Sequence, residues 1–131
     1  MKSGIIGLVM AASIVFAVAA NAHEDSKHVV TPSKQVATTV KGELVDTGCY
    51  LGHVGKGESH LSCATMCVNL GMPMGILTRK GALYLVTMNH DNPDAYNKLK
   101  TMVGKNVAVT GHVNRRSGMT GIEIESFKPA G

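Results

Sequence analysis

Hydrophobic and polar residues alternate along five short segments of the chain, the pattern of β-strands with one buried face. The segments span residues 36–45, 76–78, 83–88, 105–114 and 122–127. Turn-forming residues separate them, with R-K-G between the second and third and a glycine-containing stretch before the last. The pattern therefore predicts a mainly β domain of five strands.

Two other segments have the marks of short helices. Residues 59–70 (S-H-L-S-C-A-T-M-C-V-N-L) precede Gly71 and a proline, which together end a helix. A second helix begins after Asn92, has proline at its first position and ends at Gly104. Residues 48–57 contain four glycines in ten positions, and this composition predicts a loop.

The predicted order is strand, cysteine-bearing loop and helix, two strands, helix, two strands. Five strands with a helix between the third and fourth match a small Greek-key barrel of the OB type. A hairpin-rich β-sandwich with two helical insertions is the alternative. Either way, we expect residues 36–128 to form one domain in which residues 46–75 are an enlarged connection between the first two strands.

The first 22 residues have the pattern of a signal peptide: Lys2, an apolar run over 5–20 and the A-N-A cleavage signal at 20–22. Cleavage leaves 109 of the 131 residues and removes one lysine, so the formal charge falls from +4 to +3. Residues 23–35 are polar and aperiodic, which predicts a flexible leader. We therefore expect a periplasmic or secreted protein without a stable membrane span after cleavage.

The candidate chemistry lies in residues 46–75, which contain all three cysteines. In an oxidising compartment cysteines pair or hold a metal, and an odd number cannot pair completely within one chain. His60, Cys63 and Cys67 stand at i, i+3 and i+7, so they share one face of the predicted helix. With Cys49 from the end of the first strand they could form a site of three thiolates and one imidazole for copper or zinc.

Two other interpretations of these cysteines stay open. A disulfide could join Cys49 to Cys63 or to Cys67, whereas Cys63 and Cys67 are too far apart on one helix to pair easily. Alternatively, Cys63 or Cys67 could act as a nucleophile with His60 as its base. The chain has no C-x-x-C motif, so catalysis is the less favoured interpretation.

Asp46 has two candidate roles, because it lies three residues before Cys49. Its carboxylate could accept a hydrogen bond from a ligand imidazole, in support of a metal site. It could equally accept hydrogen bonds from the backbone amides that follow it.

The motif D-x-x-C (46–49), followed by H-x-x-C-A-x-x-C-x-x-x-G-x-P (60–73), resembles that of a family of small exported, largely uncharacterised bacterial proteins. The resemblance covers roughly residues 40–127. It implies an exported β-barrel-like domain with a cysteine/histidine motif and implies no catalytic activity. The matching motif residues are Asp46, Cys49, His60, Cys63 and Cys67.

The sequence therefore predicts an exported module that binds copper or zinc. The alternative is a disulfide-stapled, OB-like domain that binds a ligand or an exported protein partner without catalysis. Nucleic acid is not an expected partner, because aromatic residues make up only 4% of the chain and the positive charge is small.

Overall fold

The computed structural model describes residues 36–131, so the predicted signal peptide and leader lie outside the described residues. The elements are β1 (Thr38–Asp46), α1 (Thr47–His53), the 3₁₀ turn η1 (Glu58–His60), α2 (Leu61–Asn69), β2 (Met74–Leu77), β3 (Leu83–Met88), α3 (Pro93–Leu99), the 3₁₀ turn η2 (Lys100–Met102), β4 (Asn106–Arg116) and β5 (Met119–Pro129). None of the helices in this part of the chain is long and apolar enough to cross a membrane.

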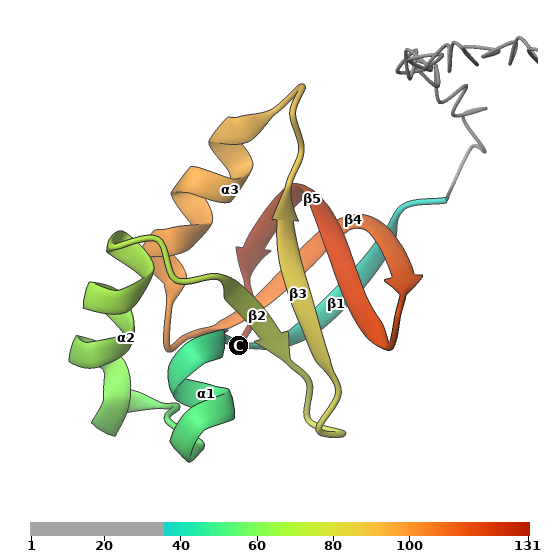
Figure 1. The fold of residues 1–131 in the computed structure, drawn as a ribbon. Helices are drawn as coiled ribbons and strands as arrows, with labels where there is room; N and C mark the ends of the chain where they lie inside the picture. The colour runs from blue at the N-terminus through green and yellow to red at the C-terminus, as the bar shows by residue number, and fades with distance from the viewer. Residues whose placement is uncertain (1–35) are drawn as a thin grey trace, which may run out of the picture. The chain divides into compact units, whose positions relative to one another are not determined.

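The five strands form one sheet whose hydrogen bonds close into a ring, in the order β1-β2-β3-β5-β4 (Figure 1). β3 and β5 run parallel, and the other four neighbouring pairs run antiparallel. The predicted five strands are confirmed. The alternative of a two-sheet sandwich is wrong, because hydrogen bonds link all five strands around a single ring.

Glycine is required where strands approach one another most closely. A Cβ atom at Gly111 would meet the carbonyl oxygen of Glu123 on β5, and one at Gly42 would meet the carbonyl oxygen of Leu77 on β2. The pairing of β4 with β5 also shifts register between Thr110 and Gly111. These glycines let the strands bend into the ring without displacing a neighbouring backbone.

The core fills the inside of the ring and continues between the sheet and the helices. Its members are apolar residues from β1, β2, β3, β4, β5, α2, α3 and the residue after η2: Val40, Leu44, Ala64, Val68, Met74, Ile76, Val86, Ala95, Leu99, Val103, Val107, Val109, Ile122 and Ile124. In β1 the buried positions Val40, Gly42 and Leu44 alternate with Lys41 and Glu43, as the sequence pattern predicts.

The domain is mixed α/β with three α-helices, so the prediction of a mainly β domain with two helices is wrong. The additional helix, α1, occupies residues 47–53, where the glycine content predicts a loop. The side chain of Asp46 caps its N-terminus, and Val54 ends it in the left-handed conformation with φ 59°. These caps compensate for the low helix propensity of Gly48 and Gly52.

Several boundaries also differ from the prediction. The segment expected as one helix over 59–70 divides into η1 and α2, with His60 as the residue that precedes α2. The last two strands are longer than predicted and meet in a tight turn at Ser117 and Gly118, which have φ 48° and 79°. Positive φ at both turn residues is typical of a two-residue hairpin.

Candidate metal centre

The three thiols meet where α1 approaches α2. Cys49 lies in the first turn of α1, and Cys63 and Cys67 lie one turn apart on α2. The Sγ atoms of Cys49 and Cys63 are 3.8 Å apart, and all three Sγ atoms lie within 4.8 Å of one another. Two separate helices therefore bring all the cysteines of the chain to one point.

The distance between Cys49 and Cys63 distinguishes two kinds of site. A disulfide joins its sulfurs at about 2.05 Å. Two thiolates on one tetrahedral ion, each about 2.3 Å from it, are about 3.8 Å apart. The observed 3.8 Å excludes a disulfide; it fits the second arrangement and equally an S–H···S contact between protonated thiols.

The predicted disulfide from Cys49 to Cys63 or Cys67 is not formed, because no sulfur pair within residues 36–131 is at bonding distance. The packing of α2 sets where its two thiols lie. Its buried residues Ala64 and Val68 fix the helix against the core and leave the neighbouring Cys63 and Cys67 half-buried beside α1. Cys49 itself is 8% exposed.

Asp46 fixes the position of Cys49. Its Oδ1 accepts hydrogen bonds from the backbone N–H of Gly48 at 2.7 Å and of Cys49 at 3.3 Å. Thr47 attaches the start of α1 to the loop after α2, because its N–H and its hydroxyl both donate to the carbonyl of Pro73. Asp46 thus has the backbone-capping role, and it also lies beside the thiols with its Oδ2 buried and unpaired within the described residues.

The ionisation of the site follows from this burial. Burial alone would raise the pKa of Asp46, but the adjacent Cys49 thiol and the hydrogen bonds from the amides of Cys49 and Gly48 hold it below its usual value. The same carboxylate, together with burial, raises the pKa of Cys49 to about 12. Burial also raises the pKa of the Cys67 thiol. Thiols with raised pKa are poor nucleophiles, and a metal ion bound here would have to displace their protons.

The structure places His60 apart from the predicted set with all three cysteines. His60 groups instead with Cys49 and His53, and the ligand atoms of these three residues lie within 4.8 Å of one another. The rings of His53 and His60 are 5.0 Å apart in an edge-to-face arrangement. Cys49 therefore belongs to two candidate ligand sets: the three-thiol set (Cys49, Cys63 and Cys67) and the two-imidazole set (Cys49, His53 and His60).

His53 is a candidate ligand that the sequence prediction leaves out. It follows Cys49 by four residues, and in a helix residues at i and i+4 share one face. The four-residue spacing of Cys49 and His53 can be read in the sequence, but it indicates a shared face only if residues 47–53 are helical. Because a loop is predicted there, the sequence analysis does not pair the two residues.

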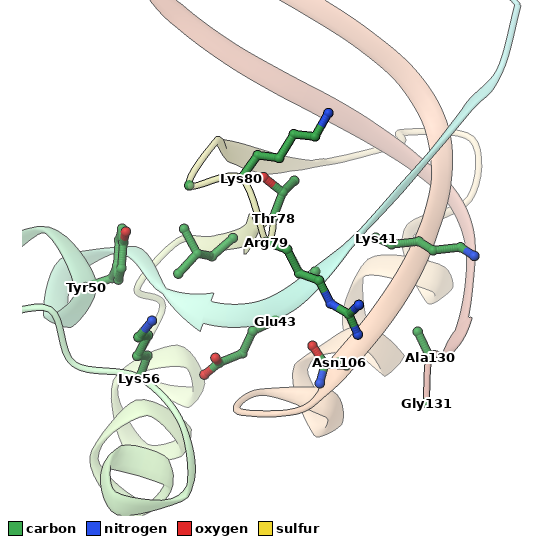
Figure 2. Close-up of a pocket in the computed structure, with 13 residues that line it drawn as sticks. Lys41, Glu43, Tyr50, Lys56, Thr78, Arg79, Lys80, Asn106, Ala130 and Gly131 are labelled. Carbon is green, nitrogen blue, oxygen red and sulfur yellow. The ribbon is translucent and has the colours of Figure 1, made fainter.

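A separate hollow of about 670 Å³ lies between β1, the β2–β3 turn and the chain after α1 (Figure 2). Lys41, Lys56, Arg79 and Lys80 line it with Glu43, and the guanidinium of Arg79 points toward Asn106. Glu43 already accepts a hydrogen bond from the N–H of Gly57. None of the cysteines or histidines of the candidate metal sets lines this hollow.

No protein-family model, curated protein or solved structure matches the chain. The functional argument therefore depends on the residues and the geometry of the chain itself.

Proposed function

We propose that this protein is an exported metal-binding module in which Cys49, Cys63 and Cys67 hold one soft metal ion, copper(I) or zinc(II). The observation that supports it is the convergence of three sulfurs from two helices within 4.8 Å. Thiolates are the preferred ligands of copper(I) and common ligands of zinc. The 3.8 Å between two of these sulfurs fits two bonds to a shared ion.

The architecture proposed for this module is an OB-type barrel. Its support is the strand order β1-β2-β3-β5-β4 with α3 between β3 and β4. In this fold the connection between β1 and β2 is one of the loops that bind ligands, and here it contains both α1 and α2. Export is proposed from the signal-peptide pattern of residues 1–22, and family membership from the cysteine/histidine motif.

The two metals make different demands on the site. Copper(I) is satisfied by soft thiolate ligands, and three of them provide a complete coordination shell. Structural zinc is four-coordinate, so zinc would need a fourth ligand, which water or an imidazole could supply. Because each bound thiolate must lose its proton, and because the pKa of Cys49 is raised, binding of either ion releases protons to solvent.

The test is the metal content of the protein purified under reducing, oxygen-free conditions and then loaded with copper(I) or zinc(II). We expect one ion per chain in the wild type. Cys63→Ser and Cys67→Ser should each lower the affinity by at least about tenfold, because a thiolate ligand is lost. Ser62→Ala, a change of an exposed residue on α2, is the matched control and should bind as the wild type does.

Retention of wild-type affinity in both cysteine variants would refute the proposal, provided that both variants fold. Circular dichroism of the metal-free proteins checks folding. Both cysteines are only half-buried, so serine at either position introduces little strain.

A second candidate function is binding of an exported protein partner. Of the nine large hydrophobic residues that are exposed in the described chain, six lie in residues 51–72: Leu51, Val54, Leu61, Met66, Leu70 and Met72. Exposed apolar residues that concentrate in one region are typical of an interaction surface. Cross-linking in the periplasm should then capture a partner with wild type and lose it with Leu70→Ser, whose side chain is 81% exposed.

A further inference from the structure

The three-thiol set and the two-imidazole set share one residue, Cys49. They draw their other ligands from different places. α2 supplies both remaining thiols, whereas α1 supplies His53 and the turn η1 supplies His60. The sulfur of Cys49 therefore belongs to one ligand set with two imidazole nitrogens and to another with two further thiols.

The two sets differ in their access to solvent. The three-thiol set contains one buried and two half-buried residues, whereas the two-imidazole set includes the exposed His53. His53 is the exposed member, so it is the first ligand of the two sets that an ion arriving from solvent meets. The two-imidazole set is therefore the outer position, and the three-thiol set is the inner one.

The backbone of Gly55 fixes the ring of His60 within the two-imidazole set. The ring packs on the backbone of Gly55, where an added Cβ would lie 2.7 Å from Nε2. The Nε2 atom is buried and has no hydrogen-bond partner within the described part of the chain. A buried, unpaired nitrogen carries a free-energy penalty, and coordination of an ion there would supply the missing partner.

We propose that Cys49, His53 and His60 form a loading site that passes copper(I) to the three thiolates. The ion binds first to the two imidazoles and to Cys49, whose thiol proton goes to solvent. Cys63 and Cys67 then replace His53 and His60, each thiol losing its proton, while Cys49 stays bound throughout. The oxidation state of copper does not change, and the imidazoles return to their uncoordinated form.

This order of ligands has a chemical reason. Copper(I) prefers thiolates to imidazoles, so its transfer from the outer to the inner set lowers the free energy. The shared sulfur keeps the ion attached during the exchange, and free copper(I) is never released. The inference rests on the proposed function, because the three-thiol set is the destination of the ion.

The test measures the rate and the extent of copper(I) transfer from a coloured copper(I)–bicinchoninate complex to the full-length metal-free protein. With His53→Gln we expect loading slower by at least about tenfold, the lower end of what loss of a supporting metal-site residue costs. The final stoichiometry and affinity should stay within about threefold of wild type, because His53 is absent from the final ligand set. His90→Gln, at an exposed histidine between β3 and α3, is the control and should load as fast as wild type.

A second variant examines the outer site alone. Cys67→Ser removes an inner ligand, so copper(I) should still arrive at the wild-type rate but be held at least about tenfold more weakly. The double variant Cys67→Ser/His53→Gln should lose this remaining binding. His53 is exposed, so its replacement by glutamine leaves the packing of α1 unchanged, and circular dichroism confirms the fold of each variant.

The outcomes separate the two proposals. If His53→Gln loads at the wild-type rate, the loading site is refuted while the three-thiol site stands. If His53→Gln lowers the final affinity as much as Cys67→Ser does, both residues bind the ion in one mixed site, which also refutes the relay. If the wild type binds no copper(I), the proposed function fails and the loading site fails with it.

Discussion

The ring of strands and the segment from α1 to α2 differ in how many of their side chains are buried. In the ring, strand residues such as Leu44, Val107 and Ile122 are fully buried, and two glycines allow backbones to come into contact. In the segment 47–73, only a few residues are buried, and six large apolar side chains are exposed. Hydrophobic packing fixes the first region along all its strands, whereas the second is held by the buried Ala64 and Val68 and by a small number of polar contacts.

Those contacts occur at the start of α1 and in the chain that follows it. Asp46 caps the helix, Thr47 donates twice to Pro73, and Glu43 accepts from the N–H of Gly57. The candidate ligands therefore lie in the region with fewer buried apolar side chains. Such a region is more readily opened, as the proposed uptake of an ion would require.

The largest expected effect on stability is in the ring. Gly111→Ala should lower the free energy of unfolding by about 3 kcal/mol, because the new Cβ meets the backbone carbonyl of Glu123 and the strands must separate. Gly121→Ala is the matched control: its Cβ would come no closer than 3.4 Å to the Leu85 carbonyl oxygen, an ordinary contact. Urea unfolding measures both. Equal destabilisation by the two changes would contradict the role of Gly111 in closing the ring.

The next largest effect on stability is expected from binding of the metal ion. At a free ion concentration about 100 times the dissociation constant, loading should raise the free energy of unfolding by about 2.7 kcal/mol. Hydrogen exchange should show the increase in protection first in α1 and α2, since local opening there exposes the ligands. A chelator should reverse it. A uniform increase with no difference between α1, α2 and the ring would contradict the picture of a loosely held ligand segment.

Asp46 connects the two regions, and its replacement should have an intermediate effect. Asp46→Ala removes the cap of α1 and should lower the free energy of unfolding by about 1 kcal/mol. Copper(I) affinity should fall by about tenfold or more, because we expect the loss of the support of Cys49 to outweigh the easier loss of its thiol proton without the carboxylate. Asp46→Asn keeps an oxygen at the cap, so its helix should be nearly as stable as in wild type.

The charge of Asp46 makes the stability of the wild-type protein depend on pH. The folded state lowers the pKa of this carboxyl below its usual value of 3.8, so its charge stabilises the fold above that pH. The contribution disappears as the pH falls through the lowered value. Acid titration of stability should therefore be flatter in Asp46→Asn than in wild type, and identical curves would show that the carboxylate is not held in its charged form.

The sequence predicts the strands well and the ligand segment poorly, for a physical reason. Alternation is local information, and the third strand is predicted at its observed limits, Leu83–Met88. The helix α1 is not predicted, because the low helix propensity of its glycines outweighs the one favourable cap, Asp46, when only neighbouring residues are considered. Without that helix, the i, i+4 relation of Cys49 and His53 cannot be recognised.

The distance between the sulfurs could not be predicted at all. It depends on how α2 seats Ala64 and Val68 in the core while Thr47 holds α1 to the loop after α2. The sequence therefore identifies the cysteines as candidate ligands, whereas the structure groups His60 with Cys49 and His53 rather than with all three thiols. Tertiary packing, rather than helical periodicity, decides which residues meet.

The smallest effects come from two glycines on either side of the C-terminus of α1, and they should have opposite signs. Gly52 lies in α1 with open space around an added Cβ, so Gly52→Ala should stabilise the helix by up to about 1 kcal/mol and raise the melting temperature by a few degrees. At Gly55 the same methyl group collides with the ring of His60. Gly55→Ala should therefore slow copper(I) loading while the final affinity of the three thiolates is unchanged. Thermal melts and transfer kinetics of the two variants measure this contrast, and equal loading rates would show that the position of His60 does not matter to the arriving ion.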